Sequence, residues 1–213
     1  MGMAFLAKLL QRGTSATEVS AKGGQHGDIA VSQFLPAYAQ LCAAGKVFGA
    51  QSAGTAIAPV NAVPTTAASW GLYNANPGGG PHLVLLKVAF IAQSGTLGLG
   101  GAIIGTVGIG EQSAIVANYT TSYMGCLDGT AKQPNAFLDN ATTLVGTQSP
   151  WVTLGVTQHV AAVSVGAGVW ADVNGLMVCP PHGTIGLDLL APTGTTALFD
   201  ITILFAEIQL DLS

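Results

Sequence analysis

A stretch of 23 residues without a charged side chain, Val88 to Gly110, constrains the fold more than any other part of this sequence. It is long enough for a helix to cross a membrane. However, seven of its residues are glycine and four are Gln, Ser or Thr. A helix of this composition would have poor intrinsic propensity and few bulky side chains facing lipid. The composition therefore argues against a membrane span.

The periodicity of the same stretch indicates β-strands. From Leu97 onward the odd positions are mostly Leu, Ile or Val, whereas the even positions are Gly, Ala or Thr apart from Ile104. A period of two is typical of a strand, and glycines within it admit a bend or a close neighbour. We therefore predict paired strands over residues 95–110, with Gly101 and Gly105 at a contact with a neighbouring chain. Phosphate-binding glycine motifs do not fit this segment, because it contains no lysine and no helix follows it.

The remainder of the chain also favours strands. The segment "HLVLLKVAFI", starting at His82, is apolar on both faces, as expected for a strand in the middle of a sandwich. From residue 168 to the end, apolar segments separated by the turns "PPHG" and "APTGTT" predict an antiparallel meander. In the last segment the apolar residues change from odd to even positions, which predicts a bulge near Ala206 and Glu207. The predicted fold is all-β, a jelly-roll-like antiparallel β-sandwich.

One domain is expected, preceded by an arm. Residues 1–27 include "GTSATEVSAKGGQHG", which is too polar and too rich in glycine to fold alone, so we predict an extended N-terminal arm. Residues 28–213 are assigned to the β-sandwich domain. Apolar residues at helical spacing, ended by Gly45, predict one short helix near residues 32–44 within that domain. This helix could pack against a neighbouring chain or cover the domain's own core, and we prefer the second assignment.

The charge content predicts association. Only 8% of the residues are charged, whereas about 25% is usual for a soluble domain. So few charges cannot cover the surface, and the apolar patches that remain usually become interfaces. Four spaced cations in the first 50 residues are too few to indicate a nucleic-acid partner. The three cysteines are far apart and odd in number, which favours free buried thiols over a disulfide framework.

No catalytic or cofactor motif emerges from the sequence. The patterns G-x-S-x-G, H-E-x-x-H and C-x-x-C do not occur. The nearest metal pair is Cys179 and His182 in "CPPHG", whose prolines and glycine indicate a turn instead. Asp128 and Asp139 are likewise assigned to turns in preference to a cation site. We therefore predict a protein that is not an enzyme and that has no cofactor and no metal.

The tryptophans offer a different kind of site. Three of them are distributed along the strand patterns, and together they could form a sugar-binding platform. Isolated tryptophans in strands more often belong to the core, and that assignment is preferred here for Trp70, Trp151 and Trp170.

Three segments carry a family resemblance: "GKVFGAQ", "WGLYNANPGGGPHLVLLKVAF" and "CPPHGTIGLDLLAPTG". Over roughly residues 45–213 the chain resembles virion structural proteins of tailed bacteriophages, of the capsid-decoration or head-fibre type. The resemblance implies a β-sandwich that assembles as a homotrimer, is located in the virion and contacts other capsid proteins. Two alternatives are a major capsid protein with a single jelly roll and a carbohydrate or host-receptor binding module.

If the resemblance holds, the arm is the expected anchor. Its apolar side chains would fill a groove on the particle, and its cations would face acidic groups there. The residues predicted to contribute are Phe5, Leu6, Lys8, Leu9, Leu10, Arg12 and Lys22.

Overall fold

The structure is a computed structural model, and it describes residues 38–52, 56–96, 101–109, 124–144, 147–157, 168–192 and 195–210. These residues belong to one compact unit, Tyr38–Ser213. The predicted arm, with the seven residues from Phe5 to Lys22 assigned to it, lies outside the described residues.

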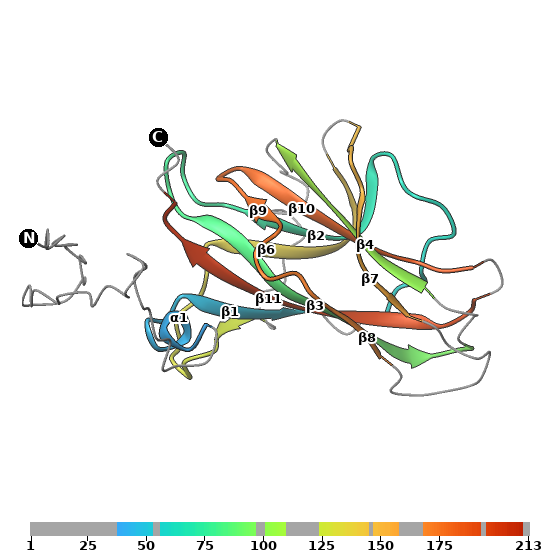
Figure 1. Ribbon diagram of the computed structural model, residues 1–213, viewed down its shortest axis with the longest axis horizontal. Coiled ribbons are helices and arrows are strands. Elements are labelled where there is room, and N and C mark those ends of the chain that lie inside the picture. Colours follow the sequence, from blue (N-terminus) through green and yellow to red (C-terminus); the bar gives the residue numbers. More distant parts are fainter. Residues whose placement is uncertain are drawn as a thin grey trace, which may run out of the picture. The chain divides into compact units, whose positions relative to one another are not determined.

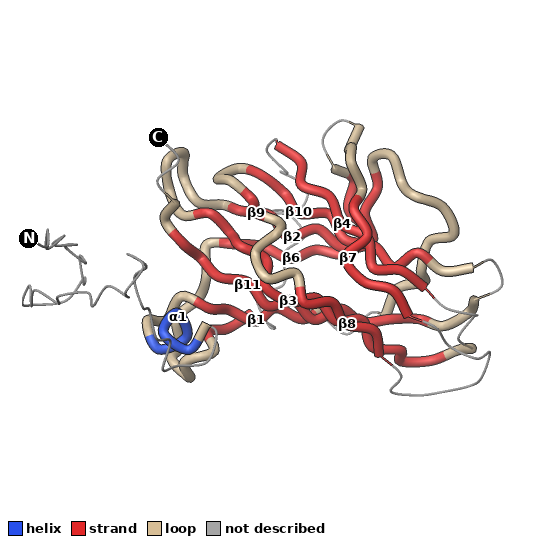
Figure 2. The backbone as a smooth tube through the Cα atoms, viewed as in Figure 1, coloured by secondary structure: helices blue, strands red, loops and turns tan. Residues whose placement is uncertain are grey.

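Two antiparallel sheets form the sandwich (Figures 1 and 2). The first sheet has the spatial order β5 (Met124–Cys126), β1 (Val47–Gln51), β11 (Leu198–Ile208), β3 (His82–Ser94) and β8 (Gly168–Asp172), and β9 (Val178–Cys179) also pairs with β3. The second sheet has the order β6 (Ala136–Thr143), β2 (Ala67–Asn74), β10 (Gly183–Leu190), β4 (Gly101–Ile109) and β7 (Val152–Thr157).

The order of the strands is that of a jelly roll. Strands β1, β3, β8 and β11 lie in the first sheet, while β2, β4, β7 and β10 lie in the second. The chain therefore wraps around the core, crossing between sheets instead of completing one sheet before the other. Strands β5 and β6, which lie between β4 and β7 in the sequence, extend each sheet by one strand. The all-β sandwich predicted from the sequence is confirmed. The meander predicted from residue 168 onward is wrong, because the described strands β8, β10 and β11 do not pair with one another.

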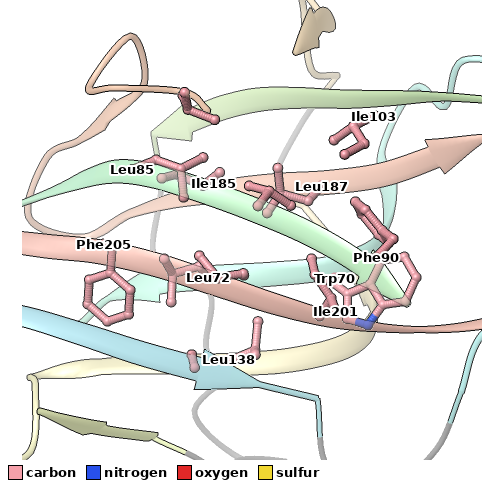
Figure 3. Packing of buried hydrophobic residues seen from close by; sticks show 14 of the residues in the cluster. Trp70, Leu72, Leu85, Phe90, Ile103, Leu138, Ile185, Leu187, Ile201 and Phe205 are labelled. Atoms are coloured by element: carbon pink, nitrogen blue, oxygen red, sulfur yellow. The ribbon is translucent and has the colours of Figure 1, made fainter. Parts of the chain in front are cut away.

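The core lies between the two sheets (Figure 3). Strand β3 is an inner strand that pairs with β11 on one side and with β8 and β9 on the other, as its two apolar faces predicted. Its residues Leu85, Val88 and Phe90 are fully buried in the core. From the facing sheet, Trp70 of β2 contributes another fully buried ring.

The bulge predicted near Ala206 and Glu207 is confirmed only in part: an irregularity in the register lies close by, between Leu204 and Phe205, but the extra residue is on β3 and not on β11. Register runs without a break from Phe205 to Ile208 against β3, and the nearby irregularity falls on β3, where Leu86 has no opposite residue. The apolar residues of β11 change phase because this strand is covered on both faces. Beyond the main core, Val47, Leu86 and Ala206 form a second buried cluster on the outer face of the first sheet.

The described helix α1 (Ala39–Ala43) covers that second cluster. Its residues Leu41 and Cys42 pack against the cluster, so the helix covers its own domain as predicted. The helix ends at Gly45, whose φ of +61° lies in the left-handed region that favours glycine. Lys132, from the segment between β5 and β6, donates a hydrogen bond to the carbonyl oxygen of Gly45 at 2.5 Å.

The uncharged stretch forms strands. Residues Val88–Ser94 are the second half of β3, and Gly101–Ile109 form β4. Within the part of the chain that the structure describes, no helix has the length and apolar character needed to cross a membrane. The inward positions of β4 include Ile103 and Gly105, which are odd, in agreement with the predicted period of two.

Candidate interaction surface

The three most exposed apolar side chains, Leu176, Val156 and Trp170, belong to strands and a turn at one edge of the sandwich. Strand β7 is the edge strand of the second sheet and β8 is the edge strand of the first, among the strands described. The two strands pack against each other at Gly155, where an added Cβ would lie 3.0 Å from the Cβ of Ala171. We call this surface the β7–β8 edge. Its exposed apolar residues are Val152, Val156, Trp170 and, in the turn after β8, Leu176.

Trp170 is the largest of these side chains, and it is 65% exposed. On β8 its neighbours Val169 and Ala171 point into the core, so the alternation of the strand directs Trp170 to the outer face of the first sheet. The residue opposite it on β3 is Ala89, whose small side chain leaves the indole largely uncovered. The core position predicted for Trp170 is therefore wrong, whereas the one predicted for Trp70 is confirmed.

Two charged groups lie near the indole, one on β8 and one on β3. Asp172 lies two residues beyond Trp170 and so shares its face of the sheet. Its carboxylate forms an ion pair with Lys87 of β3, with 3.2 Å between Nζ and Oδ1. Both side chains are exposed, so the pair contributes little to stability. It does place hydrogen-bonding groups of both signs beside an exposed aromatic ring.

Hydrogen bonds to β3 and to Tyr38 hold the turn after β8 that contains Leu176. The amides of Val173 and Asn174 both donate to the carbonyl oxygen of Leu86, at 2.8 and 2.9 Å. Leu86 is the residue of β3 that has no opposite residue on β11. Tyr38 donates a hydrogen bond from its hydroxyl to Oδ1 of Asn174 at 2.9 Å. The turn thus presents Leu176, 85% exposed, on a fixed backbone.

The structure places Gly105 in the interior. A Cβ at this position would lie 3.0 Å from Leu154 Cδ1, 3.0 Å from Met177 Sδ and 3.1 Å from Leu187 Cδ2. The close neighbours predicted for Gly105 are therefore side chains of its own core, and we correct its assignment to an interface. Gly101 begins β4 opposite Thr157 of β7, next to the β7–β8 edge. Its interface role remains a prediction.

The turn predicted at "CPPHG" is confirmed. Gly183 donates from its amide to the carbonyl oxygen of Pro180 at 2.9 Å, and His182 has a φ of +61°. Burial raises the pKa of the Cys179 thiol to about 12, so the free thiol stays protonated at neutral pH. Among the described residues, no three His, Cys, Asp or Glu side chains are grouped to hold a metal ion.

Asp128 forms the turn expected of it, whereas the turn predicted at Asp139 is wrong, because Asp139 lies within strand β6. Its Oδ1 accepts hydrogen bonds from the hydroxyl of Thr130 at 2.7 Å and from the amide of Thr130 at 2.8 Å. The hydroxyl hydrogen bond is the largest cause of a lowered pKa for this carboxylate, followed by the amide. The three cysteines are free thiols, with Cys126 and Cys179 buried and Cys42 half-buried, as predicted.

The described geometry therefore offers a surface for binding. An edge with four exposed apolar side chains can associate with another surface, and the Trp170 face can also stack against a ring. Comparisons with protein-family models, with curated proteins and with solved structures give no match to this chain.

Proposed function

We propose that this protein is a structural subunit of a virus particle, a capsid decoration protein that forms a symmetric homo-oligomer, with a trimer favoured. The observation that carries the proposal is the β7–β8 edge, where Val156, Trp170 and Leu176 are 74%, 65% and 85% exposed. A chain with only 8% charged residues has few means to keep such an edge solvated. Covering the edge by association removes that difficulty.

The backbone of the edge strands also favours association. An edge strand has backbone donors and acceptors that no further strand satisfies, and proteins normally protect it with charges, proline or a covering segment. The described part of β7, Val152–Thr157, contains no charged residue and no proline. Tryptophan is also among the residues that contribute most to interface affinity, typically about 2 kcal/mol or more when truncated. Trp170 is accordingly the residue that we expect at the centre of the subunit contact.

The arm and the shell complete the proposal. Residues 1–27 would attach the subunit to other capsid proteins, and localisation would be the virion. A major capsid protein with a single jelly roll is the nearest alternative, since the strand order is the same for both roles. Deleting residues 1–27 separates the two, because a decoration subunit should keep its oligomeric state and lose binding to shells. Full occupancy of shells by the truncated chain would contradict the anchoring role of the arm.

Surface variants test the role of the edge. Val156→Ser and Trp170→Ala should each weaken the oligomer by about tenfold or more, because each removes apolar area from the proposed contact. Val63→Ser is the matched control, since Val63 is also exposed, at 54%, but lies outside the edge. Sedimentation equilibrium of the three variants provides the measurement. Equal effects from Val63→Ser and Val156→Ser would contradict the proposed location of the contact.

One observation favours a second candidate, a carbohydrate or host-receptor binding module. Trp170 lies beside the ion pair of Lys87 and Asp172 on one face of the first sheet, which joins an aromatic surface to hydrogen-bonding groups. A glycan array with the wild-type chain and with Trp170→Ala tests this role. Binding that Trp170→Ala abolishes, from a chain that sediments as a monomer, would support the module and contradict the subunit.

A further inference from the structure

The outer face of the second sheet buries a carboxyl group. On β10, Ile185, Leu187 and Leu189 point into the core, so Thr184, Gly186 and Asp188 lie on the opposite face. Asp188 is nevertheless completely buried. Its Oδ1 accepts hydrogen bonds from the amide of Ser69 at 2.9 Å and from the hydroxyl of Ser69. Its Oδ2 is buried without a hydrogen-bond partner.

Two further polar atoms on this face are also buried without a hydrogen-bond partner. The hydroxyl oxygens of Thr106 and Thr184 are both buried and have no hydrogen-bond partner. Thr106 lies opposite Gly186 in the register of β4 and β10, so it is diagonal to both Asp188 and Thr184. Buried polar atoms without partners are rare and destabilising. Thr106 is a neighbour of Asp188 on this face, so two of these atoms belong to one polar site.

Leu144 and Gln148 lie over this face and fit onto its glycines. A Cβ on Gly186 would lie 2.6 Å from Leu144 Cδ1, and a Cβ on Gly108 would lie 2.4 Å from Gln148 Oε1. Both residues are tied to the segment before β2: the Leu144 amide donates to the carbonyl oxygen of Thr66 at 2.7 Å, and the Gln148 amide donates to that of Thr65 at 2.8 Å. Gly186 is the residue next to Asp188 on the outer face of β10, so Leu144 packs beside the position of Asp188.

No described cation balances the carboxylate. Lys87 is paired with Asp172 on the first sheet, Lys132 is bound at Gly45, and Lys46 precedes β1 of that same sheet. From β4, the outward neighbours of Asp188 are Ile104 and Thr106, which do not titrate in the accessible pH range. From β2 and the turn before β10, the titratable groups on this face are Tyr73 and His182, with 3.4 Å between Tyr73 Oη and His182 Nδ1. From β6, Asp139 lies opposite Gly71 and is a further titratable group on this face.

Burial raises the proton affinity of the Asp188 carboxylate. Removal from water raises the pKa of Asp188 from 3.8 to about 6, and the two hydrogen bonds from Ser69 oppose the rise in part. The carboxyl group is therefore neutral in mildly acidic solution and charged at neutral pH. When ionised, the carboxylate lies beside Ile104 and Thr106, and among the described residues only Ser69 donates hydrogen bonds to it.

We propose that Asp188 is a proton-dependent latch, whose neutral form lets Leu144 stay packed on Gly186 of β10 and whose ionised form loosens it. The proton is held on Oδ2, because Oδ1 already accepts two hydrogen bonds. When it leaves for solvent, the charge must be hydrated, and water reaches Oδ2 once Leu144 lifts from Gly186. The outer face of the second sheet would then be tighter in mildly acidic solution than at neutral pH. This inference does not depend on the proposed assembly role.

Hydrogen–deuterium exchange of the full chain tests the latch. After correction for the intrinsic pH dependence of exchange, protection of peptides containing Leu144 and Ser69 should fall by about tenfold or more between about pH 5 and about pH 7.5. In Asp188→Asn the fall should disappear. Asp172→Asn is the matched control and should keep the wild-type profile, because Asp172 is exposed. A wild-type profile that does not change with pH, or a fall that persists in Asp188→Asn, would overturn the proposal.

A second variant, Ser69→Ala, tests the proposal even if Asp188→Asn fails to fold. Ser69→Ala retains the backbone donor but removes the hydroxyl hydrogen bond that favours the charged carboxylate. The midpoint of the change in protection should therefore move to higher pH. A midpoint that stays in place or moves to lower pH would contradict the role of Asp188.

Discussion

Trp70 and Phe90 meet edge to face across the sandwich, with ring centroids 4.9 Å apart and an interplanar angle of 68°. Trp70 belongs to β2 in the second sheet and Phe90 to β3 in the first, so this contact joins the two layers at the centre of the core (Figure 3). The arrangement is the one that aromatic quadrupoles favour, and it adds about 0.5–1.5 kcal/mol to the burial of the two rings.

Truncating Trp70 should therefore be strongly destabilising. Trp70→Ala is expected to lower the free energy of unfolding by about 3–5 kcal/mol, because it removes a fully buried ring and leaves a cavity between the sheets. Val63→Ala should change it by no more than about 0.5 kcal/mol, since Val63 is exposed. Denaturant titrations followed by circular dichroism give both values. Similar losses for the two variants would contradict the described core.

Glycine at position 105 is expected to be required for packing. Gly105→Val should lower the free energy of unfolding by about 1–3 kcal/mol, because its side chain would collide with Leu154, Met177 and Leu187. Gly125→Val, in β5, is the matched control, since no heavy atom lies within 4 Å of a Cβ placed there. Thermal unfolding of the two variants distinguishes the positions. Gly105→Val that unfolds normally but fails to assemble would restore the interface role predicted from the sequence.

Stability should decrease as the pH rises through the titration of Asp188. Its folded pKa, about 6, exceeds its ordinary value of 3.8, so the folded state binds this proton more tightly than the unfolded state. The free energy of unfolding should then fall between about pH 4 and about pH 6, by up to roughly 3 kcal/mol. Asp188→Asn should remove this slope and be more stable than the wild type at neutral pH. An unchanged slope in denaturant titrations of Asp188→Asn would show that another group carries it.

The periodicity of the sequence predicted the strands well. The two apolar faces of the segment from His82 predicted that β3 would be an inner strand, and the period of two predicted β4. Both predictions succeeded because successive side chains of a strand point to opposite faces of the sheet, so the sequence pattern reports which faces are buried. The same local signal could not separate Trp70 from Trp170. Both stand in strand patterns, and their burial depends on which strands flank them in the folded sheet.

Features that depend on distant parts of the chain were not predictable. The phase change in β11 was interpreted as a bulge, because the sequence does not reveal that α1 covers Ala206 from the other side of the sheet. The site around Asp188 was missed for a similar reason. It joins β10 to Ser69 and Leu144, which are separated from it by more than 40 residues.

The molar mass of the purified chain in solution tests the central claim most directly. Light scattering over a range of micromolar concentrations should give a constant multiple of the 21.4 kDa chain mass, with three chains favoured. Such a mass is expected because association covers the β7–β8 edge, where Val156, Trp170 and Leu176 are exposed. A stable and soluble monomer of 21.4 kDa at every concentration would contradict the account.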